Sequence, residues 1–268
     1  MKINQPKVSV IMSCFNSEKY VEYAIKSIMK QEYKNWELIL IDDCSTDSTL
    51  KILKKYKSKK LKILKSKKNI GQHKAIHLAL KKSLGKYIAI LDSDDCSHRK
   101  RIVDQVSVLE KNKSIGLVVT AFKVINEKNR FVKKSDFLVD KEFDRRFPCE
   151  NLCAFSSSMF RKQFVKKLNY YDKTYEYAHD YYFFLKIFSV SKIKYINKFY
   201  TILRAHNNSR TNTFNKINLI LEDLKFLNWS RKNGFINKNN ILLYCKNVFK
   251  NYIKLFIAVV LKLVDRHA

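Results

Sequence analysis

Short apolar runs alternate with helical periodicity over the first part of the chain. The runs are Val8–Cys14, Trp36–Ile41, Leu61–Leu64 and Tyr87–Leu91. Continuous apolar runs rich in β-branched residues are typical of buried strands, and apolar residues that recur at helical spacing are typical of amphipathic helices. The pattern predicts the order β-α-β-α-β-α-β, which implies an α/β fold with a doubly wound, mostly parallel sheet flanked by helices.

Each predicted helix carries one apolar face. We expect Ser17 to cap the first helix, which runs to about Gln31, and Gly85 to end the third. The apolar positions, in chain order, are Val21, Ala24, Ile25, Ile28 and Met29; Leu50, Leu53 and Tyr56; Ala75, Ile76, Ala79 and Leu80; and Ile102, Val103, Val106 and Leu109.

The second half of the chain mixes strands, helices and one long polar segment. Asn126–Glu150 has no clear period and is expected to be a long excursion, which in a compact domain is often a lid or binding segment. Strands are predicted at Gly116–Ile125, Leu152–Phe160 and Lys194–Leu203, and helices at Asp180–Val190, at a segment with Ile217, Ile220, Leu221, Leu224 and Leu227 that breaks near Gly234, and from about Lys238 to Val264.

Polar residues follow each of the first strands. Right-handed crossovers bring the carboxyl ends of such strands to one edge of the sheet, where ligands bind. We therefore expect residues 13–16, 42–43, 69–71 and 92–95 to face one crevice. Asp92, Asp94 and Asp95 repel one another unless a cation compensates them, and such hard oxygen ligands suit Mg²⁺ or Mn²⁺. The alternative is a solvated acidic turn that caps the next helix.

Composition narrows the class of protein. The chain has only 4 Gly among 268 residues, and neither G-x-G-x-x-G nor G-K-[ST] is present, which excludes a glycine-rich dinucleotide loop and a P-loop. None of the 6 cysteines forms a C-x-x-C pair, so we expect reduced thiols in a cytosolic protein. We expect no signal peptide, and no stretch reaches the roughly 18 apolar residues of a membrane span.

The formal net charge is +30. Such an excess attracts nucleic acid, anionic lipid or phosphorylated substrates, although biased genome composition is an alternative origin. The basic residues are spread along the chain, with short clusters such as Lys54–Lys68, whereas a nucleic-acid-binding protein would gather them on one face. We therefore expect no nucleic-acid partner and keep the basic nucleic-acid-binding protein as an alternative function.

Four segments together carry a family resemblance: V-S-V-I-M-S-C-F-N (Val8–Asn16), L-I-L-I-D-D-C-S-T-D (Leu38–Asp47), N-I-G (Asn69–Gly71) and Y-I-A-I-L-D-S-D-D (Tyr87–Asp95). In this order they resemble family 2 glycosyltransferases, which have the GT-A fold and invert the anomeric carbon. The resemblance implies a GT-A domain over residues 1–210, with a nucleotide-sugar-binding half (1–125) and an acceptor and catalytic-base half (126–210). A C-terminal helical extension would cover residues 211–268.

The resemblance also implies roles for single residues. Phe15 would stack on the nucleotide base, Asp43 or Asp42 would bind the uracil, and Asp92 would lie on the sugar side. The implied nucleotide-sugar-binding residues are Ser13, Phe15, Asn16, Asp42, Asp43, Asn69, Gly71, Asp92 and Ser93. The implied ligands of Mn²⁺ or Mg²⁺ are Asp94, Asp95 and His206, the last from the pattern R-x-H-x-x-S at Arg204–Ser209.

An inverting transfer needs a general base for the acceptor hydroxyl. The resemblance places Asp180, in Y-A-H-D-Y-Y-F-F-L, in that role, and a helix N-cap is the alternative reading of this residue. Two departures affect the donor contacts: relatives often have A-R-N where this chain has Ala75, Ile76 and His77, and a proline at the position of Arg99.

The expected function is a metal-dependent transfer of a sugar from a UDP-sugar to a hydroxyl of a cell-surface glycan or lipid-linked acceptor. The alternative enzyme is a sugar-nucleotide nucleotidyltransferase, which usually carries a glycine-rich basic loop where this chain has S-C-F-N-S. Phe256–Leu261 lies among lysines, so the last helix could bind an anionic membrane surface or close a core or dimer contact. We expect a cytoplasmic protein, peripheral on the inner face of the membrane, and the oligomeric state is left open.

Overall fold

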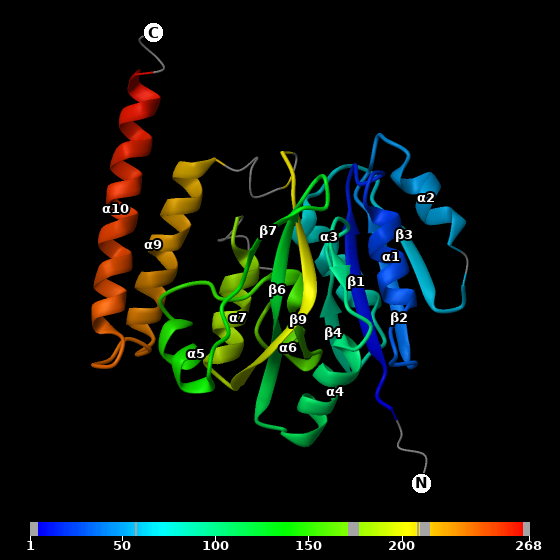
Figure 1. Ribbon diagram of the computed structural model, residues 1–268, viewed down its shortest axis with the longest axis horizontal. Coiled ribbons are helices and arrows are strands. Elements are labelled where there is room, and N and C mark those ends of the chain that lie inside the picture. Colours follow the sequence, from blue (N-terminus) through cyan, green and yellow to red (C-terminus); the bar gives the residue numbers. More distant parts are fainter. Residues whose placement is uncertain (1–4, 57, 171–176, 208, 210–214, 265–268) are drawn as a thin grey trace. The chain divides into compact units, whose positions relative to one another are not determined.

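The computed structural model describes residues 5–56, 58–170, 177–207, 209 and 215–264 (Figure 1). The chain divides into two compact units that are not continuous in sequence. The first comprises Met1–Phe137, Cys153–Asp172 and Lys186–Ala205, and the second comprises Leu138–Leu152, Lys173–Leu185 and His206–Ala268. The division at residue 210 that the sequence suggests stays a prediction.

The first unit is built on a mixed sheet. Its strand order is β3-β2-β1-β4-β8-β6-β9-β5, with β7 paired to β6. β1 to β4 are mutually parallel, β8 runs antiparallel between β4 and β6, and β6 and β9 are parallel. The strands are β1 (Val8–Cys14), β2 (Trp36–Asp42), β3 (Leu61–Lys65), β4 (Tyr87–Ile90), β5 (Cys96–Ser97), β6 (Ile115–Asn126), β7 (Phe131–Lys134), β8 (Met159–Arg161) and β9 (Lys192–Ala205). The predicted mixed, mostly parallel α/β sheet is confirmed.

Helices alternate with the strands of the first unit as the periodicity predicts. They are α1 (Val21–Met29), α2 (Thr49–Lys55), α3 (Gln72–Lys82), α4 (Arg101–Lys111) and the short α6 (Gln163–Lys167). β1, β2 and β4 are buried along their whole length, because helices cover both faces of the parallel part of the sheet. Burying one Leu, Ile or Val side chain contributes about 1.5–3 kcal/mol, so this central part anchors the strand ends that carry the polar loops.

Three details of the predicted helices are wrong. α1 begins at Val21, and the side chain of Ser17 caps no helix but bonds to the carbonyl of Phe15 and the hydroxyl of Ser93. Met29 is 48% exposed, since the helix ends there. Gly85 does not end α3, which stops at Lys82; instead a Cβ at Gly85 would lie 2.4 Å from the backbone nitrogen of Ser9.

Two segments of the second half also differ from expectation. The polar stretch after β6 is not a structureless excursion, because it contains β7 and the helix α5 (Asp140–Arg146). Leu152–Phe160 is not one strand: Phe155–Ser157 forms a 3₁₀ turn, η1, and only Met159–Arg161 pairs with the sheet. The hydroxyls of Ser157 and Ser158 donate to the carbonyls of Ala154 and Phe155, and such local bonds favour a turn over an extended strand.

The second unit is helical. It holds α5, the first turns of α7 (His179–Phe188), and the pair α9 (Lys216–Lys232) and α10 (Ile241–Val264), which lie side by side (Figure 1). Its interior is aromatic: Tyr181 meets the rings of Phe147 and Phe226 edge-on at 5.4 and 5.3 Å. Gly234, with φ +75°, allows the turn after α9. In the part of the chain that is described, no helix, α10 included, is both long enough and apolar enough to cross a membrane.

Candidate functional site

The loops after β1 and β2 are joined by hydrogen bonds. Asn16 adopts a left-handed backbone (φ +46°), and its side-chain oxygen accepts from the amide of Thr46 at 2.9 Å. The amide of Asn16 in turn donates to the hydroxyl of Ser45 at 3.1 Å. A short amide side chain tolerates this conformation and bonds locally. The two loops therefore form one rigid rim at the carboxyl edge of the sheet.

Asp43 ties the second loop to the third. Its two carboxylate oxygens accept from the amides of Ile70 (3.0 Å) and Gly71 (2.8 Å). Gly71 has φ +83°, a conformation that side chains rarely adopt. Asp43 is buried, so its first role is to hold the N-I-G loop, a contact that the residue pattern alone did not reveal. Among the described residues, Oδ2 of the buried Asp42 has no hydrogen-bond partner.

The acids that follow β4 are held by the same loops and by η1. The side-chain amide of Gln72 donates to Oδ1 of Asp92 at 2.7 Å. The backbone amide of Asp92 donates to the hydroxyl of Ser156 at 2.9 Å. Ser93 bonds to Ser17 at 2.7 Å. The turn at Asp92–Asp95 is thus joined to the first loop, to the start of α3 and to η1.

Asp94 and Asp95 differ in their surroundings. Asp94 is half-buried, whereas Asp95 is buried and accepts a hydrogen bond from the amide of Arg204 at 2.9 Å. Burial raises the pKa of Asp95 well above its usual range, and the charges of Asp94 and Asp92 raise it further, against bonds from Ser156 and Arg204 that lower it. Carboxylates crowded in this way favour a nearby cation.

A buried arginine binds the backbone on either side of this turn, at the end of β4 and after η1. The guanidinium of Arg101 donates to the backbone carbonyls of Ile90 (2.9 Å) and Ser158 (2.8 Å), and its Nε donates to Gln105 at 3.1 Å. Burial lowers the pKa of Arg101 to about 9, and the nearby charge of Asp95 opposes that shift. Arg101 therefore fixes the end of β4 to η1 and places a positive charge behind the acids.

The remaining predicted donor residues line the rim. Phe15 is 46% exposed, which leaves its ring face available for stacking. Ser13 is buried at the end of β1, and Asn69 is exposed next to the N-I-G glycine. Burial, followed by the charges of Asp42, Asp94 and Asp92, raises the pKa of Cys14.

The predicted base, Asp180, belongs to the second unit. It is half-buried in the first turn of α7. The amides of Tyr177 and Ala178, just before the helix, both donate to Oε2 of the buried Glu222 at 3.0 Å. Both amides precede α7, so these bonds hold the chain that leads into the helix, and the base and N-cap interpretations of Asp180 both stay predictions. Glu222 therefore positions the turn that carries Asp180.

The predicted site residues fall into two groups. Those from Ser13 to Asp95 lie in the first unit, where the bonds above connect the loops that carry them, whereas Asp180 and His206 lie in the second unit. The carbonyl of the half-buried His206 accepts from the amide of Ser209 at 3.0 Å. Over the described ranges, no group of three or more His, Cys, Asp or Glu side chains is arranged to hold a metal ion.

Several supporting residues were missed in the sequence. Gln72, Arg101 and Glu222 sit in helices whose patterns mark them only as polar positions. Ser156 belongs with them, because its hydroxyl accepts from the backbone amide of Asp92. One feature of the sequence points to Arg101. It is a basic residue at the N-terminus of α4, where the helix dipole disfavours a positive charge, so its presence there suggests a partner elsewhere in the fold.

Comparison with known proteins bears on this arrangement. The model of Glycosyl transferase family 2 matches residues 9–198. A Bacillus subtilis (strain 168) sequence that bears the glycosyltransferase name EpsE is 43% identical over 125 residues, which cover 46% of this chain and 45% of EpsE. The match thus spans less than half of that relative's length.

Solved structures share the fold. S. aureus TarS in complex with UDP-GlcNAc has a TM-score of 0.71 at 22% identity, over 93% of this chain and 72% of that chain. The mannosyltransferase PcManGT from Pyrobaculum calidifontis, in complex with GDP-Man and Mn²⁺, has a TM-score of 0.69 at 16% identity, over 99% and 76%. Taken with the family model, which covers most of the first unit, these likenesses lead to one conclusion: the chain belongs to glycosyl transferase family 2.

Proposed function

We propose that this protein is a metal-dependent, inverting glycosyltransferase that moves a sugar from a UDP-sugar to a hydroxyl group. The observation that carries the proposal is the hydrogen-bonded convergence of four strand-end loops around the carboxylates of Asp92, Asp94 and Asp95. In an open α/β sheet this edge is the ligand site. TarS with UDP-GlcNAc and PcManGT with GDP-Man are similarly folded proteins with nucleotide-sugars bound, which supports a donor of this class.

The donor lies along the rim in this proposal. Phe15 stacks on the base with its exposed face, and Asp42 supplies the unpartnered Oδ2 for a donor group of the base. Asp43 contributes by holding the N-I-G loop. Ser13, Asn16 and Asn69 are neighbouring polar groups that contact the nucleotide. Asp92 and Ser93 face the sugar and the ribose. A buried carboxylate oxygen without a partner has a strong demand for a hydrogen bond, which a uracil N–H would meet.

The carboxylates are ligands of the kind that a divalent cation takes, and substrate phosphates would complete the set, because the described side chains form no metal site by themselves. Mg²⁺ and Mn²⁺ prefer oxygen ligands, and nucleotide-dependent sites usually use one or two carboxylates together with substrate phosphates. We assign Asp94 as the principal ligand, because it is half-buried while Asp95 is buried and bonded to the amide of Arg204. Asp95 and His206 are the further candidates. When bound, the cation neutralises the charge that develops on the leaving diphosphate.

Asp180 is the proposed general base. Its carboxylate takes the proton of the acceptor hydroxyl, the acceptor oxygen forms a bond to the anomeric carbon, and the bond from that carbon to the diphosphate oxygen breaks with its electron pair leaving on the nucleoside diphosphate. Attack from the face opposite the leaving group inverts the anomeric configuration. Glu222 keeps the start of α7 in place for this step.

The proposed acceptor is a cell-surface glycan or a lipid-linked saccharide, used at the cytoplasmic face of the membrane. The net charge of +30 supports attraction to anionic acceptors and to an anionic membrane surface. The protein would be peripheral there.

A thermal-shift screen of UDP-, GDP- and dTDP-sugars with and without Mn²⁺ tests the proposal. A ligand present at a hundredfold excess over its Kd stabilises the native state by about 2.7 kcal/mol. We expect a Mn²⁺-dependent rise in Tm with UDP-sugars, lost in Asp94→Asn and kept in the matched control Glu32→Gln, whose carboxylate is in an exposed ion pair with Arg99. A chain that shows no metal-dependent shift with any nucleotide-sugar contradicts the proposal.

A further inference from the structure

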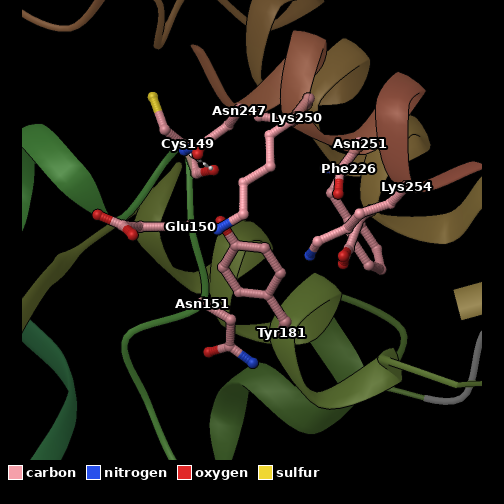
Figure 2. Close-up of a pocket in the computed structure, with 11 residues that line it drawn as sticks. Cys149, Glu150, Asn151, Tyr181, Phe226, Asn247, Lys250, Asn251 and Lys254 are labelled. Atoms are coloured by element: carbon pink, nitrogen blue, oxygen red, sulfur yellow. Dashed lines mark hydrogen bonds between the residues drawn. The ribbon is translucent and has the colours of Figure 1, made fainter. Parts of the chain in front are cut away.

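The second unit contains a polar pocket of about 200 Å³ (Figure 2). α10 forms one wall, α9 and the first turn of α7 form another, and residues 149–151 close it. Because every lining residue belongs to the second unit, the pocket is separate from the rim that carries the proposed donor site.

The lining of the pocket combines cationic, amide and hydroxyl-binding groups. Lys250 and Lys254 point into it from α10 in Figure 2, next to the amides of Asn247 and Asn251. Asp223 of α9 also lines the pocket. Ammonium groups bind phosphate, and amides with a carboxylate bind hydroxyl groups, so the lining suits a phosphate that carries a polyol.

The charge balance of the pocket favours an anion. Glu150 also lines the pocket, but it is already paired with Arg146, whose Nε lies 2.6 Å from its Oε1. With Glu150 paired, the remaining charged groups of the lining are the two lysines and Asp223. Burial raises the pKa of Asp223 to about 6, and the charge of Glu222 raises it as well, whereas Lys254 lowers it.

Another side of α10 is apolar and exposed. Leu242, Phe249 and Phe256 recur every seven residues and are 84%, 68% and 71% exposed. Tyr252, Ile253 and Ile257 are exposed on the same face of the helix. An exposed stripe of this size on a helix marks a surface that binds a partner or a lipid.

Lysines border the stripe on one side. At 100° per residue, Lys246, Lys250 and Lys254 lie about 40°, 80° and 120° around the helix from Leu242. Two of these three lysines also line the pocket. Ile241–Val264 contains no Asp or Glu, so no acid of the helix opposes an anionic surface. The lysine row therefore lies between the apolar stripe and the side of α10 that lines the pocket.

We propose that α10 lies in the interface of an anionic membrane and that the pocket binds the headgroup of an anionic phospholipid. The phosphate lies between Lys250 and Lys254, the headgroup hydroxyls bond to Asp223 and Asn251, and the apolar stripe enters the acyl boundary. An interfacial helix combines these features: an apolar face, a cationic border and too little apolarity to span. The inference rests on the peripheral membrane location in the proposed function and uses none of its donor or base residues.

A lipid surface suits this face better than a second copy of the chain. A two-fold contact between two identical stripes brings two lysine rows together on chains that each carry a formal charge of +30. An anionic bilayer supplies the opposite charge along the whole row. Self-association is therefore a result that would contradict the proposal.

Vesicle flotation tests the inference, with phosphatidylcholine vesicles compared with vesicles that also contain phosphatidylglycerol. We expect binding to the anionic vesicles alone, reduced about tenfold or more in the double variant Phe249→Ser, Phe256→Ser. A lysine near an anionic surface is worth about fivefold in binding. Lys250→Gln and Lys254→Gln should exceed that loss, while Lys246→Gln, which borders the stripe without lining the pocket, should show the fivefold effect alone.

Separate results would overturn the headgroup site and the membrane surface. Equal losses of vesicle binding in Lys246→Gln and Lys250→Gln would reject the headgroup site. A rise in Tm with free glycerol phosphate, in a chain that binds no vesicles, would also reject it. Absence of flotation with phosphatidylglycerol, or self-association that Phe249→Ser abolishes in sedimentation, rejects the membrane surface. The UDP-sugar thermal shift, measured on the same variants, should be unchanged, so that failure of membrane binding is distinguished from failure of the donor site.

Discussion

The bond network around Asp43 makes a quantitative prediction about the N-I-G loop. In Asp43→Ala, the amides of Ile70 and Gly71 lose both carboxylate oxygens. A hydrogen bond to a charged group contributes about 1.5–3 kcal/mol, so two such bonds set an upper range of about 3–6 kcal/mol. The actual loss should be smaller, because the Gly71 amide also reaches Oδ1 of Asn69 at 3.1 Å and the loop is open to water.

We therefore expect Asp43→Ala to lower the unfolding free energy by about 2–3 kcal/mol in urea titrations followed by circular dichroism. Asp43→Asn keeps one acceptor oxygen and turns an amide group toward a backbone donor, so it should lose an intermediate amount. Both variants should weaken UDP-sugar binding, since the loop after β3 is released. An Asp43→Ala protein within about 0.5 kcal/mol of the parent chain would refute the reasoning, because changes of that size are usual for surface substitutions.

Four further predictions follow from the contacts described. Asp180→Asn should fold and bind the donor with unchanged Tm shift but lose transfer by at least about a hundredfold, as measured by nucleotide release. Arg101→Met should cost about 3–5 kcal/mol in unfolding free energy, since it strips two backbone carbonyls of a buried charged donor. Gly85→Ala should cost about 1–3 kcal/mol, because its Cβ meets the backbone nitrogen of Ser9. Asp223→Asn should raise stability at neutral pH by at most about 3 kcal/mol and flatten its pH dependence.

The sign of the last prediction comes from the raised pKa of Asp223, about 6 against an ordinary 3.8. The folded state holds this proton more tightly than the unfolded state, so stability falls as pH rises from about 4 to about 6. Unfolding titrations of both proteins across that range measure it, and parallel curves would show that Asp223 is not the cause. For the other variants, normal turnover in Asp180→Asn, or parent-like stability in Arg101→Met or Gly85→Ala, counts against the contact concerned.

The apolar pattern by itself determined the parallel half of the fold. Val8–Cys14 and Trp36–Ile41 are continuous apolar runs, and only strands covered on both faces bury every residue of such a run. Right-handed crossovers then require the polar ends of these strands to share an edge. For this reason Asn16, Asp43 and Ser93 were brought together correctly without knowledge of a single contact.

Only the tertiary structure decided which partners those polar residues take. The base-binding role of Asp43 stays a prediction, and the structure adds that its carboxylate accepts from the amides of Ile70 and Gly71, because two loops far apart in sequence meet there. Arg101 and Glu222 have no local pattern that distinguishes them from solvated charges, since their partners lie on other elements. Hydrophobic periodicity is a local property that one segment displays alone, whereas a hydrogen bond across the fold depends on where two segments finally lie, and that position follows from the packing of the whole unit.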